Sequence, residues 1–200
     1  MDLPHIYSNI HSSDAQPPRF SELFRGLTLQ LGNETTLELK SILSRQHALL
    51  GRGTCVIQAS GPEDWTNKYG SNLVAKISFP PAITKPEGEI LQAIIDIAKK
   101  KKQLWVLNRL PDYIHHERVE WDHGNSGLQK RLVSLLQELS NIPYEERKLE
   151  ILVLRELSPI TNLVSTKTLA PAIRDIFKCY RWLYNEAKLM HRDVSTENIM

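Results

Sequence analysis

Cysteine is scarce in this sequence, as are long apolar runs and any excess of charge of one sign. Only two cysteines, Cys55 and Cys179, occur in 200 residues, and they match no paired disulfide or metal spacing, which is typical of a reducing compartment. No apolar run approaches the roughly 18 residues that a membrane span needs, and the first residues lack the basic and apolar regions of a signal peptide. The formal net charge of +2 is too small to attract nucleic acid in bulk. We therefore expect an intracellular protein, cytoplasmic or nuclear, with no membrane or nucleic-acid partner.

The residues that are present are typical of an ordinary soluble chain with a polar beginning. Hydrophobic residues make up 41% of the sequence and charged residues 24%, which is normal for a globular domain. Residues 1–18 offer too little apolar surface to offset the entropy of ordering, so we expect a disordered tail there. Residues 20–31 shift from helical toward alternating apolar spacing, and this pattern is ambiguous.

Apolar periodicity predicts most of the remaining elements. Five strands are expected, at residues 37–43, 48–59, 73–79, 103–110 and 149–154, the second of them interrupted by Gly51-Arg52-Gly53-Thr54. Three amphipathic helices are expected, at residues 87–98, 128–139 and 169–187. The polar, turn-rich stretches 61–72 and 112–127 are expected to be loops.

The last ten residues carry the strongest motif. His191-Arg192-Asp193, followed after four residues by Asn198, resembles the catalytic loop of protein kinases. In that loop the carboxylate accepts the proton of the attacking hydroxyl, while the amide oxygen binds magnesium. We therefore predict Asp193 as catalytic base beside His191 and Arg192, and Asn198 as a metal ligand. Ser195 stands where serine/threonine kinases usually carry a lysine.

Two glycines and one strand lysine extend this comparison. Gly51 and Gly53 could bring backbone N–H groups close to phosphate oxygens, or could simply form a turn between two strands. Lys76 matches the strand lysine that neutralises ATP phosphates in kinases, or else faces solvent on an edge strand. We predict Glu87, on the buried face of the next helix, as the partner of Lys76, with Glu89 in reserve. In the alternative, both glutamates only stabilise the helix by interacting with the positive end of its dipole.

A histidine-rich stretch invites a metal interpretation. His115, His116 and His123 lie near Glu117 and Asp122. No pair of them has a convincing ligand spacing, and a histidine-rich surface loop explains them equally well.

Two other segments have open interpretations. The lysine run at 99–102 could be a nuclear signal, although basic residues are expected at the C-terminus of a helix. The strand at 149–154 leads into a connector containing Pro159, as a hinge between two lobes would. Backbone of this kind often binds a nucleotide base, so Glu156 and Leu157 are predicted contacts.

Taken together, these features resemble the fungal-type protein kinase family, which is related to serine/threonine kinases. The resemblance rests on residues 51–54, on WVLNRLP at 105–111, on Glu146-Arg147 leading to LVLRELSPI, and on the long helix that enters HRDVSTENIM. It implies an α+β fold: a kinase-like N-terminal lobe with an antiparallel sheet and one αC-type helix, a hinge, and the first long helix and catalytic loop of an incomplete helical C-terminal lobe. The implied boundaries are a tail at 1–18, the N-lobe at 19–154 with an insertion at about 112–148, and the hinge, helix and catalytic loop at 155–200.

The resemblance also implies ATP and Mg²⁺ as cofactors and phosphoryl transfer to Ser/Thr hydroxyls of a protein substrate. The sequence stops before the acidic metal-binding motif that the family pattern places next, so we expect little or no kinase activity from residues 1–200 alone. Two other functions remain open. One is a non-catalytic pseudokinase or interaction module, and the other is a small-molecule phosphotransferase on the same fold.

Overall fold

The computed structural model describes residues 19–32, 34–46, 52–119, 134–135, 145–163 and 165–189, and they fall into two compact units. The first unit runs to Gly88 and resumes at Ile114–Arg155. The second unit comprises Glu89–Tyr113 and the residues from Glu156 onward. The predicted tail at 1–18 and the catalytic loop at 191–200 lie outside the described residues, as does nearly all of the helix predicted at 128–139.

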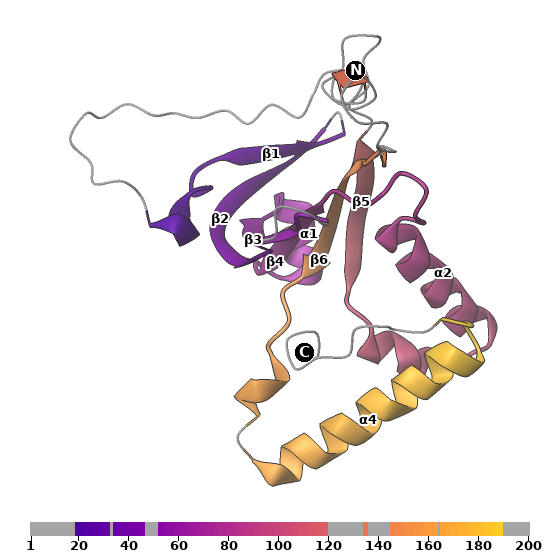
Figure 1. Ribbon diagram of the computed structural model, residues 1–200. Coiled ribbons are helices and arrows are strands. Elements are labelled where there is room, and N and C mark those ends of the chain that lie inside the picture. The colour runs from indigo at the N-terminus through magenta and orange to yellow at the C-terminus, as the bar shows by residue number, and fades with distance from the viewer. Residues whose placement is uncertain are drawn as a thin grey trace. The chain divides into compact units, whose positions relative to one another are not determined.

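The first unit is built on a six-stranded sheet in the order β1-β2-β3-β4-β6-β5 (Figure 1). Its strands are β1 Thr28–Leu31, β2 Thr35–Arg45, β3 Cys55–Ser60, β4 Leu73–Ser78, β5 Tyr113–Val119 and β6 Leu149–Arg155. The pairings from β1 through β4 to β6 are antiparallel. A short 3₁₀-helix, η1 (Phe20–Glu22), precedes β1, and helix α1 (Glu63–Tyr69) connects β3 to β4. The α+β fold with an antiparallel sheet is as predicted.

Alternation of side chains along the strands forms the core of this unit. On β2, Leu37 and Leu39 are buried while Glu38 between them is exposed, because successive side chains of a strand point to opposite faces. The buried residues of the core come from five strands: Leu29, Leu31, Leu37, Leu39, Ile57, Ala59, Leu73, Ala75, Leu149, Ile151 and Val153. Strands β4 and β6 are in addition buried at consecutive positions, and this burial on both faces fixes their place in the sheet.

The second unit is helical. It contains most of α2 (Glu87–Lys100), the 3₁₀-helices η2 (Leu104–Arg109) and η3 (Ile160–Asn162), and the long helix α4 (Thr166–Asn185). Its buried residues come from α2, η2 and α4: Ile94, Ala98, Val106, Cys179 and Trp182. The hydroxyl of Ser165 caps α4 by accepting the backbone N–H of Lys167 at 3.3 Å.

Polar contacts also join the helices of the second unit. The guanidinium of Arg109 donates to Asp175 at 2.6 Å, and this bond holds the pKa of Asp175 below its usual value. The indole N–H of Trp182 donates to the side-chain oxygen of Gln103. The segment after α2 is thereby tied to α4 by both apolar and polar contacts.

Several sequence predictions are corrected by the structure. Residues 103–110 were expected to be a strand but form η2, because only Val106 is buried and Leu104 and Trp105 are exposed. The stretch at 112–127 was expected to be a loop, yet its first part is β5, whose polar side chains find partners across the sheet. The stretch at 61–72 contains α1. The strand predicted from residue 48 begins at Cys55.

The remaining predicted elements that lie within the described residues are confirmed. Strands β2, β4 and β6 cover the predicted segments 37–43, 73–79 and 149–154, apart from one residue at the end of β4. Helices α2 and α4 match the predictions at 87–98 and 169–187 within three residues at either end. In the part of the chain that is described, no helix has the length and apolar character that a membrane crossing requires.

The thiol of Cys179 gives a test of the second unit's core. Cys179 is 7% exposed, and its burial raises the pKa of the thiol above its usual value, partly offset by the charge of Arg109. Because the thiolate is the reactive form, we expect iodoacetamide to modify Cys179 much more slowly in the folded chain than in urea at the same pH. Peptide mass spectrometry measures the two rates. Equal rates would contradict the packing of Cys179 described above.

Candidate functional site

An ion pair in the first unit joins the centre of the sheet to the start of α2. Lys76 lies on β4, where it faces Val56 of β3 and Leu152 of β6 in the strand register. Its Nζ atom is 2.9 Å and 2.7 Å from the two carboxylate oxygens of Glu87, the first residue of α2. The contact predicted between these side chains is therefore present. Glu89, the reserve candidate, is exposed.

The exposure of this pair limits what it can contribute to stability. The side chains of Lys76 and Glu87 are 29% and 40% exposed, and ion pairs in such positions are worth at most about 1 kcal/mol. Folding therefore does not depend on the pair. Exposure also leaves the Lys76 ammonium, which has three donors, accessible to an anion.

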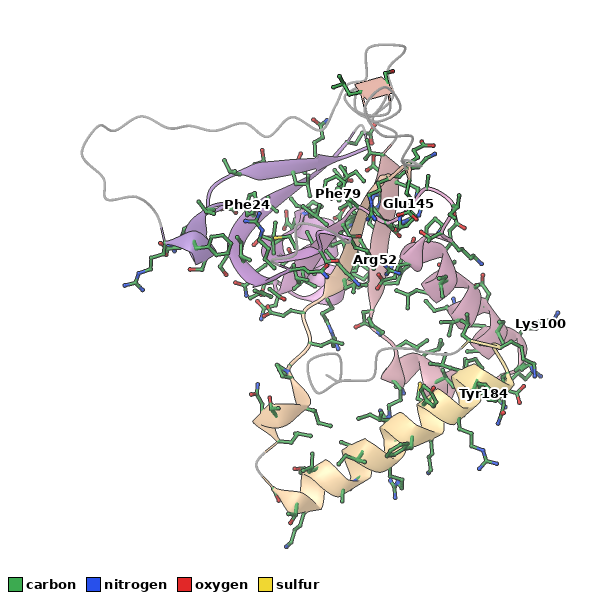
Figure 2. All side chains as sticks on the ribbon, in the orientation of Figure 1. Phe24, Arg52, Phe79, Lys100, Glu145 and Tyr184 are labelled. Atoms are coloured by element: carbon green, nitrogen blue, oxygen red, sulfur yellow. The ribbon has the colours of Figure 1, made fainter. Side chains whose placement is uncertain are left out.

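Gly53 lies two residues before β3, the strand that pairs with the strand of Lys76. Its backbone has a φ of +56°, which residues other than glycine rarely adopt. The N–H of Phe79 donates to the carbonyl of Arg52 at 2.7 Å, which extends the pairing of β3 and β4 back to this glycine (Figure 2 labels Arg52 and Phe79). Continuing the register places Gly53 opposite Phe79, which directly follows β4 and lies three residues after Lys76. Gly51 lies outside the described residues.

A cluster of buried charged side chains on β5 and β6 contacts the backbone of Glu87. The side chain of Glu150 on β6 is 5% exposed, and its Oε1 atom accepts the backbone N–H of Glu87 at 2.6 Å. The same oxygen is 3.0 Å from Nε2 of His116, and the other oxygen is 3.5 Å from Nη2 of Arg118, both on β5. Burial by itself raises the pKa of Glu150. The hydrogen bonds from His116 and Glu87, with the charges of His116 and Arg118, outweigh burial and hold that pKa below its usual value.

This cluster was not predicted from the sequence. The available signal was the single charge of Glu150 within the apolar run Leu149–Leu154, because an unpaired carboxylate is rarely buried. The second signal was Gly88, which stands in the first turn of a helix where alanine would be favoured.

The histidine-rich stretch has protein partners in this structure. His116 contacts Glu150, and Glu117 accepts the backbone N–H of Gly32 at 2.9 Å. Within the described ranges no group of three or more His, Cys, Asp and Glu side chains could hold a metal ion. His123 and Asp122 lie outside those ranges.

The remaining predicted site residues divide into two groups. Glu156 and Leu157 directly follow β6, are partly buried, and belong to the second unit. His191, Arg192, Asp193 and Asn198 lie outside the described residues.

The first unit thus offers a cation to an anionic group. Lys76 supplies an oriented, partly exposed cation, and Gly53 supplies backbone without a side chain just before the neighbouring strand β3. A Cβ atom built on Gly53 meets only the Phe79 ring, at 3.8 Å, so the glycine is there for its backbone conformation and not to relieve a clash. A cation close to backbone without a side chain fits a phosphate group. The residues predicted to hold magnesium are not among those described.

Comparison with known proteins identifies the family of the chain. No solved structure matches the chain. A family model described as "Fungal protein kinase" matches residues 19–200, as predicted from the glycine, hinge and HRD segments of the sequence. Because the match covers most of the chain, this protein belongs to the fungal protein kinase family.

Proposed function

We propose that the chain binds ATP through its first unit and that it is part of a protein kinase acting on Ser/Thr hydroxyls. The observation that carries the proposal is the Lys76–Glu87 ion pair, in which both carboxylate oxygens contact one ammonium. An ion pair that contributes little to stability, on a strand whose partner strand follows a glycine of positive φ, is the arrangement expected of a phosphate-binding lysine.

Each residue has a distinct role in this proposal. Lys76 binds the α- and β-phosphates, and Glu87 orients it. The backbone at Gly51 and Gly53 covers the phosphates, and the backbone at Glu156 and Leu157 contacts the base. In the catalytic loop formed by His191, Arg192, Asp193 and Asn198, Asp193 accepts the proton of the attacking hydroxyl and Asn198 provides an oxygen ligand for Mg²⁺. Mg²⁺-ATP, when bound, supplies the transferable phosphoryl group.

Calorimetric titration of the chain with ATP tests the proposal. We expect binding that requires Mg²⁺ and that weakens roughly tenfold to hundredfold in Lys76→Met, since a hydrogen bond to a charged group is worth about 1.5–3 kcal/mol. The matched control is Lys68→Met, which removes an exposed lysine from α1 in the same unit and should leave the affinity unchanged.

Two outcomes would contradict the proposal. The first is a folded chain that binds no Mg²⁺-ATP, which would favour a non-catalytic interaction module. The second is equal loss of affinity in Lys76→Met and Lys68→Met, which would mean that general positive charge, and not the ion pair, attracts the nucleotide.

A further inference from the structure

The buried cluster of Glu150, His116 and Arg118, here called the α2 clamp, makes three separate contacts with the chain just before and at the start of α2. Glu150 accepts the backbone N–H of Glu87. The guanidinium of Arg118 donates to the carbonyl of Ala82 at 3.3 Å and to that of Thr84 at 3.0 Å. The clamp therefore forms hydrogen bonds with the connector between β4 and α2 and with the first residue of the helix.

The third contact is steric. The imidazole of His116 lies so close to Gly88 that a Cβ atom on Gly88 would be 2.3 Å from Cγ of His116 and 2.4 Å from its Cβ. Glycine at this position lets the helix backbone lie directly on the His116 ring. The first turn of α2 is thus held both by a hydrogen bond at Glu87 and by close packing at Gly88.

Burying the carboxylate of Glu150 is an energetically unfavourable way to cap the N-terminus of α2. Removing a carboxylate from water costs several kcal/mol even when it is paired, and apolar residues of similar size often serve stability equally well. An exposed Ser, Thr or Asp at the N-cap would satisfy a helix N–H at little cost. What the clamp achieves beyond capping is to fix the position of Glu87, whose own side chain is 40% exposed and otherwise free to turn away from Lys76.

We propose that Glu150, supported by His116 and Arg118, is a positioning residue that holds Glu87 against Lys76. Glu150 acts through the helix backbone and touches neither Lys76 nor, under the proposed function, the nucleotide. The effect on nucleotide affinity rests on the proposed function. The effect on the ion pair does not.

Competitive acylation with trace acetic anhydride measures the ion pair directly. Lys76 reacts only when its amine is free of Glu87, so its rate relative to Lys68, read by peptide mass spectrometry, reports how firmly the pair is held. Glu87→Gln calibrates the fully released state, which we expect to react roughly two- to fivefold faster, the range for a half-exposed ion pair. Glu150→Ala should approach that rate. Glu150→Gln, which keeps the volume and one acceptor oxygen, should fall between it and the wild type.

A stability control separates positioning from general loosening of the fold. Ile57→Val removes one methyl group from a fully buried position on β3 and destabilises the same unit without touching the clamp. We expect it to leave the Lys76 rate unchanged. The inference is overturned if folded Glu150→Gln and Glu150→Ala both keep the wild-type rate while Glu87→Gln raises it, or if Ile57→Val raises the rate as much as Glu150→Ala.

Titration with Mg²⁺-ATP then tests whether the clamp affects nucleotide affinity through Lys76. In the wild-type background Glu150→Ala should weaken binding, and in the Lys76→Met background it should have no further effect, because both changes remove the same contact. If the wild type binds no Mg²⁺-ATP, the proposed function fails and the acylation rates alone decide the inference. If Glu150→Ala weakens binding equally in both backgrounds, Glu150 does not act through Lys76 and the inference fails while the proposed function stands.

Discussion

Replacing Gly88 with alanine is expected to lower the free energy of unfolding of the first unit by about 2–3 kcal/mol, at the upper end of the usual range for overpacking. Helix propensity argues the other way, because alanine stabilises a helix by up to about 1 kcal/mol relative to glycine. The steric clash should outweigh the gain in helix propensity, since the added methyl group would lie 2.3–2.7 Å from three atoms of His116. One of them is the His116 Cβ atom, which cannot move without its backbone.

Urea unfolding followed by circular dichroism measures this effect. The double variant Gly88→Ala/His116→Ala provides the control, because His116→Ala leaves room for the new methyl group. Its cost should be clearly less than the sum of the two single costs. A Gly88→Ala protein as stable as the wild type would show that α2 does not lie against His116.

The second large effect is expected in the helical unit, where Trp182→Ala should cost about 3–5 kcal/mol, the usual range for removing a large buried aromatic side chain. Trp182 is 6% exposed and packs with Ile94, Ala98, Val106 and Cys179. Its indole N–H also donates to Gln103, so the variant leaves that amide oxygen without its partner. We expect the amides of α4 to exchange with deuterium much faster in this variant.

Tyr184 on the same helix is the matched control. It is 53% exposed and is labelled on α4 in Figure 2. Tyr184→Ala should change stability by no more than about 0.5 kcal/mol, as exposed substitutions usually do. Similar exchange rates in the two variants would mean that the face of α4 carrying Trp182 is not the buried one.

The sequence predicted those elements whose pattern is local. Helix α2 follows Pro86 and repeats apolar residues at helical spacing, and Lys76 stands within a β-rich run, so the ion pair could be predicted from two short segments only 11 residues apart. The strands β2, β4 and β6 were predicted for the same reason, because each shows alternating or continuous apolar residues bounded by polar ones.

What could not be predicted depends on contacts between distant residues. Strand β5 contains His115-His116-Glu117-Arg118, which has no apolar pattern. It is a strand because it pairs with β6, and two of its polar side chains find partners at Glu150 and Gly32, which are 34 and 85 residues away. Residues 103–110 are apolar enough for a strand, but they form η2, with Val106 alone buried in the second unit's core. The clamp joins β5, β6 and α2, and periodicity within one element cannot reveal it.

The sheet order has a consequence for how the protein is made. Strand β4 is paired on one side by β6, whose Glu150 lies 74 residues after Lys76 (150 − 76). Ribosomes add about 5–20 residues per second, so Glu150 is synthesised roughly 4–15 s after Lys76. During that interval β4 is an open edge that another nascent chain could join, and the start of α2 has no carboxylate to hold it. Translation therefore completes the sheet and locks the ion pair in a single late event, the arrival of β6.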